Sequence, residues 1–197
     1  FAKDVLFDGT QFDESAAFRG VECRGGTALL EDDASFAGAT FGNRVTFERG
    51  QFGYSNFTDA EFTDDVIFER AEFTDDVTFE DVRFGGVTNF DEVLFEGDSV
   101  FTNAVFAETT TFRGAGFDGG TTHLDGDVIF KNATFIDVVD FSDVVCTSAE
   151  FTGVAFKKSA DFRDTEFTDS LRLKPTPPGD DTYLNFTEAT ISEGRII

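Results

Sequence analysis

Residues 60–80 read AEFTDDVIFERAEFTDDVTFE, and this stretch decides the fold. Phenylalanine recurs in it at positions 62, 68, 73 and 79, and a small or β-branched residue stands two positions before each one. Intervals of five and six residues would spread the rings around all sides of an α-helix, and they interrupt the alternation of a long strand. Each unit therefore predicts one short strand, small-x-Phe, followed by a polar corner.

The same unit fills most of the chain. A bulky residue recurs every five or six positions from Phe7 to Leu173, and the 197 residues contain 28 phenylalanines but no tryptophan or methionine. One residue type is therefore used for one repeated purpose. Self-similarity at so short a period predicts a solenoid, in which each repeat buries its apolar side only by stacking on its neighbours.

Two units, Ala60-Glu61-Phe62-Thr63-Asp64 and Ala71-Glu72-Phe73-Thr74-Asp75, show the likeness to a known family. They resemble the pentapeptide-repeat family, whose motif is small-polar-Leu/Phe-polar-any. The resemblance covers residues 5–173 and resumes at 184. It implies an all-β fold, a right-handed quadrilateral parallel β-helix of about 8 coils of ~22 residues, because parallel crossovers are right-handed. The regular sixth residue departs from the plain motif and predicts two bulged corners in each coil.

We expect residues 1–197 to form a single β-helix with an exposed Pro-rich loop at 174–183, because Pro175, Pro177 and Pro178 remove backbone donors. The chain begins without methionine and shows no capping helix, so we expect it to be a segment of a longer protein.

The rings of such a coil point inward and stack in columns, because neighbouring coils lie ~4.8 Å apart. One predicted core column contains Phe47, Phe68, Phe90 and Phe112, and a second contains Phe52, Phe73, Phe95 and Phe117. Directly after the first column we expect an acidic surface ladder of Glu48, Glu69 and Asp91, with Arg113 relieving the repulsion at one end.

The chemically reactive residue types are few and scattered. Cys23 and Cys146 occupy phenylalanine positions, and we expect two buried thiols too far apart for a disulfide. His123 is the only histidine and is expected at the surface. These residues form neither a triad nor a metal-binding pattern, so no catalytic residue, cofactor site or metal ligand is predicted. A core filled with rings leaves no pocket, which argues against an enzyme.

The charge is strongly negative: 39 Asp and Glu residues oppose 15 Lys and Arg residues, for a net charge of −24. Such a surface repels nucleic acids and anionic membranes, so neither is expected as a direct partner. The acidity is typical either of a surface suited to high salt, as in halophiles, or of an imitation of a polyanion. No apolar stretch could span a bilayer and no signal peptide is recognisable, so a cytoplasmic location is expected.

These features favour a non-catalytic structural or protein-interaction solenoid that presents acidic faces to a protein partner or neighbouring domain. Two alternatives stay open. Some pentapeptide-repeat proteins resemble duplex DNA in width and charge, which would imply a DNA mimic that inhibits type II topoisomerase or protects it. Some longer, Phe-rich relatives carry channel-like transmembrane segments, which would imply the soluble domain of a membrane protein.

Overall fold

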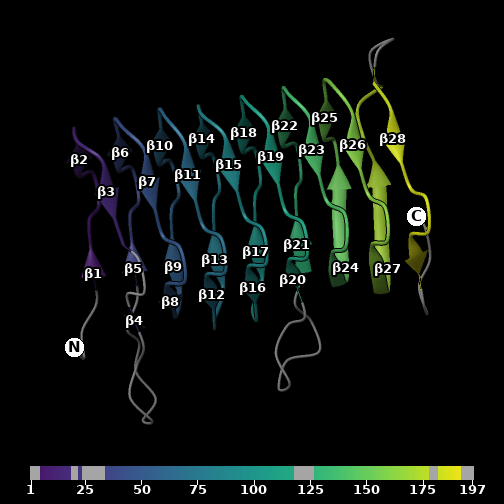
Figure 1. Cartoon of the computed structure of the whole chain (residues 1–197), viewed down its shortest axis with the longest axis horizontal. Coiled ribbons are helices and arrows are strands. Elements are labelled where there is room, and N and C mark those ends of the chain that lie inside the picture. The colour runs from purple at the N-terminus through teal and green to yellow at the C-terminus, as the bar shows by residue number, and fades with distance from the viewer. Residues whose placement is uncertain (1–4, 19–21, 24–33, 118–126, 178–181, 192–197) are drawn as a thin grey trace.

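The computed structural model describes residues 5–18, 22–23, 34–117, 127–177 and 182–191. All regular structure in these ranges is β, and short parallel strands stack side by side into a rod (Figure 1). The prediction of an all-β solenoid is therefore confirmed. The described residues contain no helix, so no helix that could cross a membrane is found among them.

Each turn of the rod contributes one strand to each of four ladders, which we call faces 1 to 4 in chain order. Face 1 contains β1 (Val5–Leu6), β5 (Ala34–Ser35), β9 (Ser55–Asn56), β13 (Val77–Thr78), β17 (Ser99–Val100) and β21 (Asp127–Ile129). Face 2 contains β2 (Gln11–Phe12), β6 (Thr40–Phe41), β10 (Glu61–Phe62), β14 (Arg83–Phe84), β18 (Val105–Phe106), β22 (Thr134–Phe135) and β25 (Ala155–Phe156).

The other two ladders complete the four-sided coil. Face 3 contains β3 (Ala16–Ala17), β7 (Val45–Thr46), β11 (Val66–Ile67), β15 (Thr88–Asn89), β19 (Thr110–Thr111), β23 (Val139–Asp140), β26 (Ala160–Asp161) and β28 (Leu184–Asn185). Face 4 contains β4 (Glu22–Cys23), β8 (Gln51–Phe52), β12 (Glu72–Phe73), β16 (Leu94–Phe95), β20 (Gly116–Phe117) and β29 (Thr190–Ile191). Two longer strands, β24 (Val145–Thr152) and β27 (Glu166–Lys174), continue from face 4 around the corner into face 1.

The described strands make about seven turns, since face 2 has seven strands. Face 3 has an eighth strand, so the last coil is incomplete. The interruption falls on the Pro-rich segment. β27 extends to Lys174, and the N–H of Thr176 still donates to the carbonyl of Val154 at 2.7 Å. The next residue, Pro177, has no N–H to donate to a following turn on face 2.

The corners are of two kinds, and they alternate. We name each corner by the two faces that it joins, so that corner 1–2 leads from face 1 to face 2. Every positive-φ residue of the described part lies in corner 1–2 or corner 3–4, two positions after a phenylalanine; Arg70 (φ 57°) and Asp81 (φ 58°) are examples. After Phe68, the N–H of Ala71 donates back to the Phe68 carbonyl at 2.8 Å, which closes a β-turn of the type II pattern. Corners 2–3 and 4–1 hold the sixth residue and no positive φ among the described residues. The extra residue thus lies in these two corners, as predicted, except that corner 4–1 lacks it between Phe52 and Phe57 and between Cys146 and Phe151.

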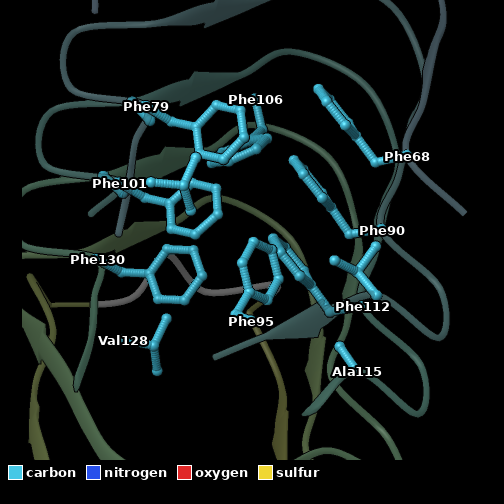
Figure 2. Close-up of a cluster of buried hydrophobic side chains, with 14 of the residues drawn as sticks. Phe68, Phe79, Phe90, Phe95, Phe101, Phe106, Phe112, Ala115, Val128 and Phe130 are labelled. Carbon is cyan, nitrogen blue, oxygen red and sulfur yellow. The ribbon is translucent and has the colours of Figure 1, made fainter. Parts of the chain in front are cut away.

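Phenylalanine rings fill the interior and stack along the rod axis (Figure 2). Ring centroids are 4.7 Å apart for Phe47–Phe68, 4.7 Å for Phe68–Phe90 and 4.8 Å for Phe90–Phe112. In the face 4 column the separations are 5.3 Å for Phe52–Phe73, 5.3 Å for Phe73–Phe95 and 4.7 Å for Phe95–Phe117. Columns of opposite faces meet edge-on, as Phe79 meets Phe90 at 5.6 Å and 80°.

Truncation of a central ring is expected to destabilise the rod strongly. Phe90 is fully buried, stacks on the rings above and below and meets Phe101 edge-on at 5.7 Å. Phe90→Ala should lower the free energy of unfolding by about 3–5 kcal/mol, as for other buried aromatic truncations. Urea titration followed by circular dichroism measures it. The control is Phe186→Ala in the last coil, where the ring is only partly buried; equal losses at the two positions would contradict the stacking argument.

Candidate interaction surface

Corner 3–4 holds the acidic residues that follow the Phe47 column. Glu48, Glu69 and Asp91 occupy equivalent positions in successive turns, each directly after a stacked ring. They do not form a bare row of like charges, because arginines of the same corner reach them. Arg49 Nε lies 3.9 Å from Glu48 Oε1, and Arg70 Nη1 lies 3.4 Å from Glu69 Oε1.

The strongest pairs of this corner join successive turns. Arg113 Nη2 lies 2.5 Å from Oδ2 of the buried Asp91, and the Arg113 N–H donates to Asp91 Oδ1 at 3.1 Å. Arg70 holds Glu92 with two hydrogen bonds of 2.7 and 3.1 Å. These bonds to Arg70 lower the pKa of Glu92, and the bond to Asp91 raises the pKa of Arg113. With Arg163, whose Nε lies 2.7 Å from Asp161 Oδ2, they make corner 3–4 a charge-compensated strip that we call the paired edge.

Corner 4–1 has a different character. Asp75, Asp76, Asp98 and Asp127 lie along it, and we call this row the acidic edge. Its carboxylates are bonded to the backbone of the corner: the N–H of Asp98 donates to Asp76 Oδ1 at 2.9 Å, and the N–H of Asp127 donates to Asp98 Oδ1 at 3.1 Å. In the described part of the chain, no lysine or arginine forms an ion pair with Asp75, Asp76 or Asp98.

The acids of the two edges have different partners: arginines in the paired edge and backbone N–H groups in the acidic edge. The sequence analysis predicted only part of the first arrangement. The sequence predicts a polar corner after each strand, and the structure adds that the aspartate side chains of corner 4–1 link one turn to the next. The pairing of Arg49 and Arg70 with the acidic ladder was not foreseen. A signal existed, because both arginines stand two positions after a phenylalanine of the same column. Among the described residues, no group of three or more His, Cys, Asp or Glu side chains could hold a metal ion.

A family model for pentapeptide repeats, nine copies long, matches residues 27–72, 51–94, 79–122 and 121–166. These matches together cover more than half of the chain. The chain belongs to the pentapeptide-repeat family. A search of curated proteins found no match. Membership of this family indicates a non-catalytic repeat protein, and it leaves the partner open.

Hollows of different character lie among the described residues of the pentapeptide-repeat rod. An apolar hollow of about 250 Å³ opens at the C-terminal end, and it is lined by Phe167, Leu171, Leu173, Phe186, Ala189 and Ile191. A polar hollow of about 140 Å³ lies over β24 and β27 and is lined in part by Asp127, Glu150 and Arg172. Ser148 and Ser170 also line the polar hollow, where the Ser170 hydroxyl donates to Ser148 Oγ at 3.1 Å and the Ser148 hydroxyl donates to Asp169 Oδ2 at 3.3 Å. The position expected for His123 lies outside the described residues.

Cys146 takes a phenylalanine position in the face 4 column. It is a buried free thiol, and it leaves a void of about 10 Å³ between the rings of Phe117 and Phe167. Cys23 lies in β4 in register with Phe52, near the other end of the same face. Burial of Cys146 raises the pKa of its thiol, because the apolar core disfavours the thiolate.

The raised pKa of Cys146 predicts a loss of stability in alkali. The folded protein keeps the thiol protonated, whereas the unfolded chain ionises it above pH ~8.5. Stability is therefore unaffected below that pH and falls as the pH rises further, by at most about 1.4 kcal/mol per pH unit from this group. Urea titrations between neutral and alkaline pH measure the slope. Cys146→Val is the control, and an unchanged slope in this variant would refute the assignment.

Loss of the Arg113 guanidinium should destabilise the paired edge. Arg113→Ala leaves the buried Asp91 carboxylate without its cation, and the expected cost is about 1–2 kcal/mol, within the range for a stranded buried acceptor. The matched control is Arg83→Ala, because Arg83 is exposed and makes no ion pair among the described residues; it should change stability by less than about 0.5 kcal/mol. Thermal and urea unfolding compare the two, and equal losses would show that Asp91 does not depend on Arg113.

Proposed function

We propose that this pentapeptide-repeat rod is a protein-interaction module that presents its acidic edge to a basic segment of a protein partner or neighbouring domain. The observation that carries the proposal is the contrast between two corners of one rod. The four acids of the paired edge between Glu48 and Glu92 are each compensated by an arginine within the chain. Asp75, Asp76 and Asp98 have no such cation among the described residues.

The geometry of the acidic edge suits a lysine- or arginine-rich segment. The carboxylates recur at the spacing of the turns, ~4.8 Å, so a partner chain lying along the rod meets one after another. Backbone N–H groups hold Asp76 Oδ1 and Asp98 Oδ1 in place, which lowers the entropy lost when a cation binds. The second carboxylate oxygen of each is available for charge-assisted hydrogen bonds.

The paired edge is the reason for preferring this function to DNA mimicry. A duplex carries phosphates around its whole circumference at one charge per ~1.7 Å. Here the arginines 49, 70, 113 and 163 interrupt the negative surface along one corner. A basic segment that docks on one corner does not need the uniform charge that a mimic of the duplex requires.

A labelled peptide of lysine, leucine and serine tests the proposal by fluorescence anisotropy. In the double variant Asp76→Asn with Asp98→Asn, the side-chain amide oxygens still accept hydrogen bonds from the backbone N–H groups, but two negative charges are removed. This variant should weaken binding of the peptide about tenfold. Asp143→Asn with Asp164→Asn removes the same charge from exposed positions in corner 3–4 and should have a much smaller effect.

If the two double variants weakened peptide binding equally, binding would depend only on the net charge of the protein, and this result would contradict the proposal. Loss of gyrase supercoiling in the presence of the protein, with no peptide binding, would favour the DNA mimic instead.

A further inference from the structure

A polar hollow of about 140 Å³ lies at the C-terminal end of the acidic edge, where β24 and β27 continue from face 4 into face 1. Two rows of side chains line it. Asp127, Ser148 and Ser170 are in register in the first row, and Glu150 and Arg172 are in register in the second. Asp127 is also the last residue of the acidic edge, so the edge leads directly into the hollow.

The two serine hydroxyls of the hollow have no proton left for a ligand. An ionised carboxylate only accepts hydrogen bonds, so the proton in the 3.3 Å contact between Ser148 Oγ and Asp169 Oδ2 belongs to Ser148. Since Ser148 has a single hydroxyl proton, the Ser170 hydroxyl is the donor in the 3.1 Å contact between the two Oγ atoms. The lone pairs that remain on both oxygens are acceptors. A ligand that binds the serines must therefore donate hydrogen bonds.

The charges around the hollow favour a ligand that is also positively charged. Asp127 and Glu150 line the hollow, and Asp169 is bonded to Ser148. Arg172 is the only cation among the described residues that line it. Its Nη1 atom lies 3.8 Å from Glu150 Oε1, which is too far for a hydrogen bond, and its side chain is 54% exposed. The volume of about 140 Å³ is the space that remains beside this side chain.

We propose that the hollow binds the guanidinium group of an arginine in the basic segment that docks on the acidic edge. The inference rests on the proposed function and adds to it an arginine at a fixed place in the segment. A guanidinium group has five N–H donors, no acceptor and a planar fork that matches a carboxylate. The size also fits, because an apolar cavity of about 150 Å³ holds benzene, which is larger than a guanidinium group.

Other ligands match the hollow less well. The ammonium group of lysine has three donors and no planar fork, so it forms fewer directed bonds with the carboxylates and the serine oxygens. A sugar hydroxyl both donates and accepts, and the serines have no donor to offer it. Among the described residues, no group of three or more His, Cys, Asp or Glu side chains could hold a metal ion here.

The register of the strands places the arginine within the segment. Asp76, Asp98, Asp127 and Ser148 occupy equivalent positions in four successive turns. Asp76 and Ser148 are therefore three strand spacings apart, or ~14 Å, which an extended chain covers in about four residues. Side chains four residues apart lie on the same side of an extended segment. We therefore expect the arginine four residues from the basic residue that contacts Asp76.

Two peptides test the inference in the full chain by fluorescence anisotropy: the lysine peptide, and the same peptide with one lysine, four residues from another, replaced by arginine. The arginine peptide should bind about fivefold more tightly. Glu150→Gln should abolish this preference, because it removes a carboxylate charge from the hollow. Glu108→Gln, the same change at an exposed position in corner 2–3, should keep it. Ser148→Ala should reduce the preference, because it removes an acceptor and frees the Ser170 proton.

Arg172 supplies a test with the opposite sign. Because its charge opposes a second cation, Arg172→Gln should strengthen binding of the arginine peptide several-fold. Weaker binding in this variant would contradict a cation site. Equal affinities of the two peptides for the unaltered protein would overturn the inference and leave the acidic edge in place, as would a preference that survives Glu150→Gln.

The hollow and the acidic edge can fail separately. Asp76→Asn with Asp98→Asn should weaken both peptides alike, which keeps the preference for arginine and tests the edge alone. If the lysine peptide does not bind, L-argininamide is titrated into the ¹⁵N-labelled protein. Saturable shifts of the Ser148 and Ser170 amide signals would then support the hollow without the edge. No shifts, or larger shifts with glucose or calcium than with L-argininamide, would overturn the inference.

Discussion

The whole rod depends on one coincidence of length. Parallel strands hydrogen-bond at a spacing of ~4.8 Å, and flat aromatic rings are also in contact at that separation. The centroids of Phe68, Phe90 and Phe112 lie 4.7–4.8 Å apart, so a single translation along the axis satisfies both the backbone ladder and the ring column. This requirement accounts for the recurrence of phenylalanine at the stacked positions of the core. It also explains the void at Cys146, where the column lacks a ring.

The same translation governs the corners. Residues with long side chains, such as Arg70 and Glu92, adopt positive φ, a conformation that costs a non-glycine residue about 1–2 kcal/mol. They are held there because the N–H of Arg70 donates to Asp91 of the next turn, while the turn itself is closed by a hydrogen bond to Phe68. Ladder and core together impose the corner on whichever residue occupies it. The sequence of a corner is therefore free to serve the outer surface.

That division decides what could be predicted from sequence. The spacing small-x-Phe indicates which side chains point inward, and the family match and the buried rings of Phe68 and Phe90 agree with it. The outer surface is less predictable. The register places Arg113 one turn beyond Asp91, so that pair could be anticipated. Whether Arg70 reaches Glu69 in its own turn or Glu92 in the next depends on side-chain rotamers, and spacing contains no information on these.

Because the interior repeats from turn to turn, the four corners contain most of what distinguishes this rod from another of the same length. Two of them differ in charge pattern: corner 3–4 is a compensated strip, and corner 4–1 is a row of aspartates. Each corner position has an equivalent position in register one turn later. A substitution at a corner therefore changes one side chain in a row that runs along the rod, and it leaves the core untouched. A partner that binds along the axis contacts the corner side chains of successive turns one after another, so its selectivity depends on which corner it contacts.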